Sequence, residues 1–282
     1  MKSSLLTNTV LTFVLFLMVT VGYAQDQEFK YGTMTFNKAV NISGKQRMLT
    51  QRMGKIYLYL LDNPEDFKAK KDLKITKIIF EKQLAILETN TENILTLRRI
   101  KEVKDTWKKY KEFLESTPNK KDAVKIINTN TTILKYANNV VNAIIAESKD
   151  DSHSDDSYLI EEDSELKNII NKSGRQRMLS QRLALYYFAN KPNLKTEGTE
   201  SKLNSVFTEL DNALDVLLIC NFNNERIDQS LGDVMALWED IKAHKEKLLK
   251  QGYNDLEIYN LSNDLTKTFN VITNLYEKIR VE

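Results

Sequence analysis

Apolar residues recur along nearly the whole chain at the three- and four-residue spacing of amphipathic α-helices. No stretch shows the apolar–polar alternation that is typical of a strand. The breaks in the pattern fall at Pro64, Pro118, Pro192 and Gly252, where a helix is expected to end. The pattern predicts eight helices, at about 28–62, 66–89, 99–116, 120–147, 158–190, 197–220, 227–250 and 254–280.

Short connections between long helices favour antiparallel neighbours in space. The stretch from Lys149 to Ser157 is polar and acidic and contains no apolar residue, which is typical of a solvated linker. We therefore expect an all-α protein made of two tandem antiparallel up-down four-helix bundles. They would occupy residues 25–147 and 158–282, with an acidic linker at 148–157.

The first 24 residues have the pattern of an export signal. Lys2 precedes an apolar stretch at 10–21, and Gly22 and Ala24 place small residues before a cleavage site. We expect a cleaved signal peptide at 1–24 and a mature protein that is periplasmic or secreted. The alternative is an uncleaved N-terminal helix that anchors the protein in the membrane.

The overall composition excludes several classes of function. The 41 basic residues nearly balance the 39 acidic ones, whereas a nucleic-acid-binding protein usually has a basic excess. Two histidines and one cysteine make a His/Cys metal site improbable. No nucleophile–base pair and no phosphate-binding loop stands out, so we expect neither an enzyme nor a cofactor.

A thirteen-residue motif occurs twice, at Asn41–Met53 and at Asn171–Leu183, with nine identical positions and a spacing of 130. The pair Val103 and Trp107 recurs as Val234 and Trp238, at a spacing of 131. Because such landmarks return in the same order, we interpret the chain as an internal duplication that covers essentially all of the mature protein.

The helix that carries the motif has two useful faces. One face is apolar and is expected to pack within its own bundle; it comprises Ile42, Leu49, Met53, Ile56 and Leu60. The opposite face steps by four and three residues, like the seam between two helices, and comprises Val40, Gly44, Arg47, Gln51, Gly54 and Leu58. The second copy repeats it as Ile170, Gly174, Arg177, Gln181, Ala184 and Phe188.

A glycine inside a helix costs about 1 kcal/mol relative to alanine, and Gly44 and Gly174 bear this cost at equivalent places. The usual reason is close approach of a backbone or a ligand. Arg47 and Arg177 follow one turn later, and a guanidinium group suits a planar oxyanion. The alternative is that they are solvated surface arginines, and for Arg52 and Arg182 we favour such a role, in salt bridges or packing at the bundle edge.

The motif Asn-x-Ser-Gly-[Lys/Arg]-Gln-Arg-Met-Leu-[Thr/Ser]-Gln-Arg resembles the signature of the PilJ/NarX-type sensor domain. This domain is the periplasmic N-terminal part of type IV pilus chemotaxis transducers and of nitrate/nitrite sensor kinases. The resemblance implies a four-helix bundle whose first helix pairs with that of a second subunit, with nitrate gripped by one arginine from each. It assigns the gripping role to Arg47 and Arg177, with Gly44 and Gly174 lining the site. The signature asparagine corresponds to Asn41 and Asn171. The residues on either side of the arginine are more similar to those of the PilJ-type members than to those of the nitrate sensors.

These patterns lead to one functional hypothesis and one alternative. The hypothesis is an exported sensory module that binds a small oxyanion such as nitrate or nitrite. Its ligand-binding residues would be Arg47, Arg177, Gly44, Gly174, Gln51, Gln181, Asn41 and Asn171. One chain would then hold both halves of the sensors' dimer and would act on a membrane signalling partner. The alternative is a helical interaction or dimerisation module, for example a homodimer, that binds no small molecule.

Overall fold

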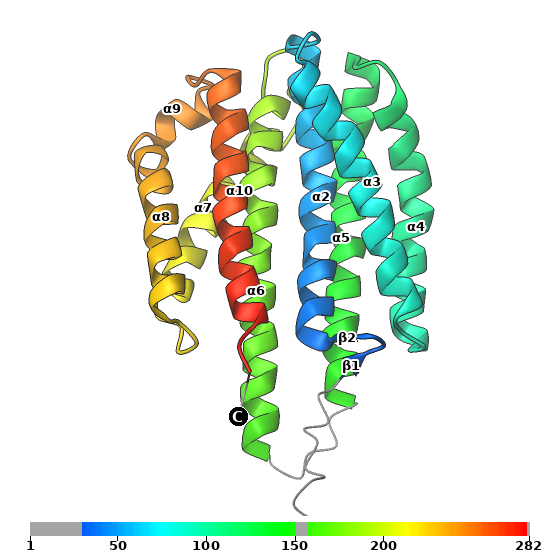
Figure 1. The fold of residues 1–282 in the computed structure, drawn as a ribbon. Helices are drawn as coiled ribbons and strands as arrows, with labels where there is room; N and C mark the ends of the chain where they lie inside the picture. Colours follow the sequence, from blue (N-terminus) through cyan, green and yellow to red (C-terminus); the bar gives the residue numbers. More distant parts are fainter. Residues whose placement is uncertain (1–29, 151–156, 281–282) are drawn as a thin grey trace, which may run out of the picture.

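Nearly every residue that the structure describes is helical. The structure is a computed structural model that describes residues 30–150 and 157–280 (Figure 1). The expected signal peptide and residues 151–156 of the expected linker lie outside this range. The first half consists of β1 (Lys30–Tyr31), β2 (Met34–Thr35), α2 (Phe36–Asp62), α3 (Phe67–Thr89), α4 (Ile94–Glu115) and α5 (Lys120–Asp150). The second half consists of α6 (Ser157–Ala189), α7 (Thr199–Leu218), α8 (Glu225–Ala243), α9 (Lys245–Leu249) and α10 (Asp255–Glu277).

The helices match the predicted ones closely, with three differences that have local causes. Helix α4 begins at Ile94 rather than near residue 99, because Asn93 caps it. Helix α2 begins at Phe36 rather than near residue 28, because a small hairpin precedes it, in which Lys30 pairs with Thr35 and Tyr31 with Met34. Gly32, at a φ of 59°, makes its turn. The single helix expected at 227–250 is instead two helices, α8 and α9, which are separated at His244.

The two halves repeat the same internal packing. In the first half the rings of Phe80 and Trp107 lie 4.7 Å apart, and the Trp107 indole donates a hydrogen bond to Glu81. In the second half the rings of Phe207 and Trp238 lie 5.0 Å apart, and the Trp238 indole donates to Asp211. The duplication inferred from the sequence is therefore visible as two similar bundle cores.

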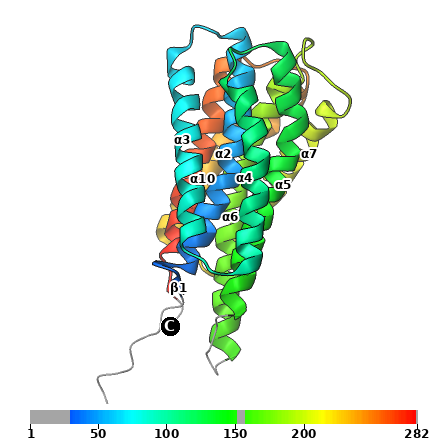
Figure 2. The ribbon, with the colours of Figure 1, turned by 90° about the vertical axis from the view of Figure 1, so that its right-hand side faces the viewer.

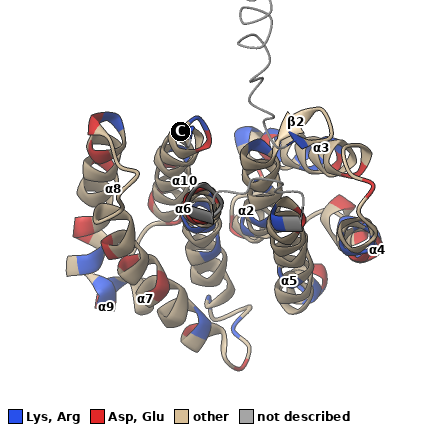
Figure 3. Cartoon of the chain, turned by 90° about the horizontal axis from the view of Figure 1, so that it is seen from below, with Lys and Arg blue, Asp and Glu red and all other residues tan. Residues whose placement is uncertain are grey.

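Helices α2 and α6 lie side by side in the middle of the molecule. Viewed from below, α3, α4 and α5 surround α2 on one side, while α7, α8 and α10 surround α6 on the other (Figure 3). The side view shows α2 and α6 running through the molecule behind α3, α4 and α5 (Figure 2). We call the face of α2 that was expected to meet another helix the seam face. It is buried at all six positions, namely Val40, Gly44, Arg47, Gln51, Gly54 and Leu58. The counterpart that this face meets is the equivalent face of α6.

Gly54 lies where α2 packs tightly against α6 and against its own half. A Cβ atom at this position would stand 2.7 Å from Cδ1 of Leu185 on α6 and 2.9 Å from the hydroxyl of Tyr110. Real Cβ atoms essentially never make such short contacts. The second half has Ala184 at the corresponding place, so this tight contact exists on one side of the seam only.

Lys55 is a buried cation that crosses the seam. Its side chain is 0% exposed, and its ammonium group donates hydrogen bonds to Ser262 at 3.0 Å and Asn263 at 2.8 Å, both on α10. It also lies 4.1 Å from the ring centre of Tyr259. Burial lowers the pKa of Lys55 well below its usual value, and the charge of Arg52 lowers it further. The equivalent residue of the second half is the apolar Leu185.

The contact at Gly54 leads to a prediction about stability. Gly54→Ala should lower the free energy of unfolding by about 1–3 kcal/mol, because the added methyl overpacks the seam by more than the gain in helix propensity. Urea unfolding of the variant and the wild type measures the difference. The matched control is Gly232→Ala in α8, where a Cβ meets no atom within 4 Å. That variant should gain up to about 1 kcal/mol. Equal effects at the two glycines would contradict the prediction.

The burial of Lys55 predicts how stability depends on pH. Between the lowered pKa of folded Lys55 and the usual value of 10.5, the unfolded chain binds a proton that the folded chain does not. The contribution of Lys55 to stability should therefore rise with pH across this window and fall as the pH falls. Urea unfolding at a series of pH values should show the wild type gaining on Lys55→Met, by at most about 1.4 kcal/mol per pH unit. A difference that does not change with pH would refute this account.

Candidate functional site

Arg47 of α2 and Arg177 of α6 meet at the centre of the seam. Both are buried, at 1% and 0% exposure. The point where a Cβ of Gly44 would stand lies 3.3 Å from Nη2 of Arg177 and 3.4 Å from Nη2 of Arg47. For Gly174 these distances are 2.9 Å and 3.7 Å. The two guanidinium groups therefore share one space, and the two glycines provide room for them.

The hydrogen bonds of the two arginines follow an approximate twofold symmetry. Nη2 of Arg47 donates to the Asn171 carbonyl at 3.2 Å, and Nη2 of Arg177 donates to the Asn41 carbonyl at 3.3 Å. Each arginine thus binds the backbone of the opposite half. Each also donates through Nη1 to an asparagine on the last helix of its own half, Asn138 at 2.8 Å and Asn270 at 3.0 Å respectively.

The positive charge of this cluster is poorly compensated. Within residues 30–150 and 157–280, no carboxylate forms an ion pair with Arg47 or Arg177. Burial lowers the pKa of both arginines to about 9, and the neighbouring Arg175 and Arg177 add to the effect on Arg47. Glu277 opposes the shift at Arg177. The Nε atoms of Arg47 and Arg177 are buried without a hydrogen-bond partner in the described part of the chain. The site therefore favours an added negative charge.

The two signature asparagines lie beside the arginines, but they make different contacts. The Asn41 side chain accepts from Nη1 of Arg177 at 2.8 Å, and its amide donates to Asn274 and Glu277. Asn171 contributes its backbone carbonyl, while its side-chain oxygen is buried without a partner in the described residues. The approximate symmetry is thus broken by the link from Asn41 to Glu277.

Gln51 and Gln181, which we also expected at the site, make their hydrogen bonds elsewhere. The Gln181 amide donates to the Ser262 carbonyl at 2.9 Å and to the Thr266 hydroxyl at 2.7 Å. Gln51 accepts from Arg182 at 3.0 Å. Neither glutamine is hydrogen-bonded to Arg47 or Arg177 in the described structure, so both belong to a neighbouring layer of the seam.

Several residues of the cluster were missed in the sequence. Asn138 and Asn270 are separated by 132 residues, which is also the spacing of Asn142 and Asn274. This common spacing on the last helices could have identified them. Arg182 was expected at the bundle edge, but it reaches across the seam to Gln51 and to Asn130 at 3.3 Å. Arg52 does make an edge salt bridge, at 3.4 Å to Asp72.

The donors at the site suit a small anion better than a metal ion. Its donors are the guanidinium N–H groups of Arg47 and Arg177, which bind oxygen atoms that carry negative charge, and the surrounding asparagines present oxygen atoms to them. Over the described ranges, no group of three or more histidine, cysteine, aspartate or glutamate residues could hold a metal ion. In the same ranges, no helix has the length and apolar character needed to span a bilayer.

The family model described as type IV pili methyl-accepting chemotaxis transducer N-term matches the chain twice, at residues 36–140 and 158–263. Each matched region contains one copy of the motif and one of the two central helices, α2 and α6. No curated protein and no solved structure matches the chain. The two regions together span well over half of the sequence. The chain therefore belongs to the PilJ family of type IV pili methyl-accepting chemotaxis transducer N-terminal domains, in a form with two tandem copies.

Proposed function

We propose that this protein is an exported sensory module that binds a small planar oxyanion, such as nitrate or nitrite, between Arg47 and Arg177. The observation that supports it best is the pair of buried guanidinium groups that share one space without an ion-paired carboxylate. The family supports the sensory role, and the chemistry of this arginine pair supports the proposed class of ligand.

The energetics favour an anion at this place. Two unit positive charges about 6 Å apart repel each other by about 3 kcal/mol at an effective dielectric constant near 20. An anion between them adds two attractions at shorter distance, which outweigh this repulsion, and it accepts charge-assisted hydrogen bonds. The buried Nε atoms of Arg47 and Arg177 offer two more donors. Binding would therefore stabilise the folded protein, by an amount that grows with the logarithm of the ligand concentration once this exceeds Kd.

The ligand would act on the packing of the two halves. Each arginine belongs to one half and donates to the backbone of the other. An anion that accepts hydrogen bonds from these N–H groups would compete with the backbone carbonyls and would change how tightly α2 and α6 are held together. Because one chain contains both halves, their effective concentration for each other is about millimolar or higher. We propose that a signalling protein of the membrane binds this protein on the periplasmic side and responds to the change in packing.

A second candidate is an interaction module without a small ligand. The specific observation in its favour is that both arginines already donate to Asn41 and Asn171 across the seam. In this case the cluster would hold the halves together, and the protein would present its surface to another protein or to a second copy.

Thermal unfolding with added sodium nitrate tests the first proposal. At a nitrate concentration of about one hundred times Kd, the stability should increase by about 2.7 kcal/mol. Sodium chloride at equal ionic strength should have a much smaller effect. The response should disappear in Arg47→Ala and in Arg177→Ala. The control is Arg52→Ala, which removes the other arginine of the same motif, the one paired with Asp72, and should keep the response.

Gly44→Ala provides a variant that retains both arginines. Its methyl group would stand 3.3–3.4 Å from the two Nη2 atoms and would occupy the space proposed for the anion. We expect a folded protein with a reduced nitrate response. If nitrate and chloride have the same effect on the wild type, the anion proposal is wrong and the interaction module is favoured.

A further inference from the structure

Helix α3 lies on the outside of the first half and exposes a mixed apolar and basic surface (Figure 3). Its buried residues, such as Leu73, Phe80 and Leu84, form one stripe that packs into the bundle. On an ordinary bundle helix the opposite side is polar. Here it carries large apolar side chains that are between 39% and 77% exposed, namely Phe67, Ile75, Ile78, Ile79 and Ile86. We call these residues, together with the exposed lysines of α3, the outer face of α3.

The outer face of α3 carries positive charge that the protein does not compensate. Among the described residues, none of its exposed lysines forms an ion pair; they are Lys68, Lys70, Lys71, Lys74 and Lys82. All three acidic side chains of α3 are instead paired with basic residues of α2 or α4, namely Asp72 with Arg52, Glu81 with Lys111, and Glu88 with Lys104. The lysines are therefore available to an external negative charge.

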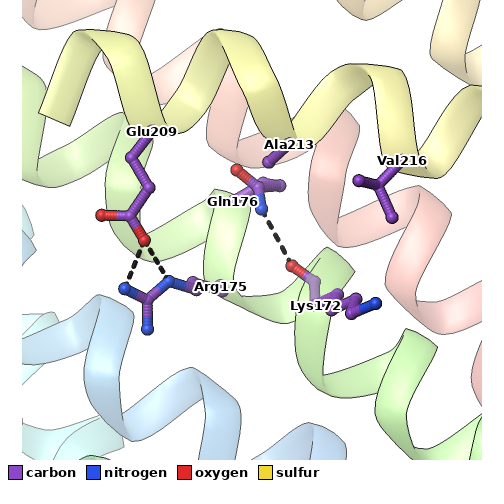
Figure 4. A pocket seen from close by; sticks show the side chains of 6 residues that line it. All are labelled: Lys172, Arg175, Gln176, Glu209, Ala213 and Val216. Atoms are coloured by element: carbon purple, nitrogen blue, oxygen red, sulfur yellow. Dashed lines mark hydrogen bonds and ion pairs between the residues drawn. The ribbon is translucent and has the colours of Figure 1, made fainter.

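The second half keeps the core of this helix but not its outer face. At a spacing of 130, the buried residues Leu73, Leu84 and Leu87 return as the buried residues Leu203, Leu214 and Leu217 of α7. The exposed positions differ. Phe67, Ile75, Ile78 and Ile79 correspond to Glu197, Ser205, Thr208 and Glu209, while Lys70, Lys74 and Lys82 correspond to Glu200, Asn204 and Asn212. Figure 4 shows Glu209 in an ion pair with Arg175 of α6. The duplicated fold therefore does not require apolar and basic residues at these places, which indicates a separate role for them in the first half.

The residue types favour a lipid surface over a protein partner. All six basic residues of α3 are lysines, whereas protein interfaces are depleted in lysine and enriched in arginine and aromatic residues. Amphipathic helices that lie on anionic membranes combine exposed apolar side chains with lysines, whose apolar stems lie along the lipid while the ammonium groups remain in water. The lysines from Lys68 to Lys82 extend over about 21 Å of helix. A protein partner would need carboxylates along this whole length, but an anionic bilayer offers negative charge everywhere on its surface.

We propose that the outer face of α3 binds the surface of a bilayer that contains anionic phospholipids. The isoleucines and Phe67 enter the boundary between headgroups and acyl chains, and the lysines contact the lipid phosphates. Because α3 runs along the length of the bundle, the protein would lie with its long axis parallel to the membrane (Figure 1). This surface is separate from the seam between α2 and α6, so the inference does not depend on the anion proposal.

Co-sedimentation with lipid vesicles tests this proposal. The protein used is residues 25–282, which contain all of the described structure and lack the apolar stretch at 10–21 that could itself insert into lipid. We expect binding to vesicles of phosphatidylglycerol mixed equally with phosphatidylcholine, and at least about tenfold weaker binding to phosphatidylcholine alone. Added salt should weaken the binding, because it screens the lysines. Failure to bind the anionic vesicles, or equal binding to both kinds, would overturn the proposal.

Replacing lysines with the residues of the second half tests the electrostatic part. A lysine near an anionic surface contributes about fivefold to binding, so Lys74→Asn with Lys82→Asn should weaken binding to the anionic vesicles about 25-fold. The matched control is Lys267→Asn with Lys278→Asn, which removes the same charge from exposed positions of the second half. It should change binding by less than about twofold. Equal losses in the two double variants would show that net charge alone, and not the outer face of α3, attracts the protein.

Ile75→Ser with Ile78→Thr tests the apolar part and retains every lysine. Binding to the anionic vesicles should fall at least about tenfold, since two apolar side chains no longer enter the lipid. The two isoleucines are 41% and 42% exposed, and the second half has serine and threonine at the equivalent places, so the fold should be retained, which circular dichroism verifies. Unchanged binding would show that the outer face of α3 is not the contact. A wild type that does not bind vesicles but forms a dimer in sedimentation velocity, which this variant dissociates, would assign the face to a second copy instead of a membrane.

Discussion

The packing of α2 against α6 is the constraint on which the rest of the structure depends. Two glycines and small side chains let the helices approach, and this approach buries Arg47, Arg177 and Lys55 together along one seam. Burying like charges is unfavourable unless they are compensated, and here neutral amides and backbone carbonyls provide most of the partners. The seam is therefore well hydrogen-bonded, but among the described residues no carboxylate forms an ion pair with Arg47 or Arg177.

Much of the architecture could be predicted from the sequence, because it follows from local rules. Helical periodicity and the proline and glycine breaks located the helices to within a few residues in most cases. The exceptions were decided by short-range details. The Asn93 side chain caps α4 by accepting from the N–H groups of Leu95 and Thr96, so the helix begins at Ile94, before the predicted start. The turn at Gly32 replaces the expected first turns of α2 with a hairpin.

The candidate site was predictable only in part, for a physical reason. The repetition of Gly44 and Arg47 as Gly174 and Arg177 identified the face that meets a counterpart, and helical geometry was enough for that step. The asparagines on α5 and α10 come from other helices, and the phase of those helices relative to α2 is set by tertiary packing. Gln51 and Gln181 lie on the predicted face, yet nearer partners such as Arg182 and Thr266 take their hydrogen bonds. Sequence spacing predicts the helix face on which a side chain lies, but it does not determine which neighbouring group becomes its hydrogen-bond partner.

The presence of both halves in one chain has a consequence for evolution. In a symmetric dimer of identical subunits, a substitution on one side of the axis always appears on the other side as well. In this chain the equivalent positions are encoded separately, and they have diverged. Lys55 corresponds to Leu185 when the two halves are aligned, and Gln83 corresponds to Ala213. One half can thus acquire a new property while the other retains the original scaffold. The result is a molecule with distinguishable sides, which a docking protein can recognise in a single orientation.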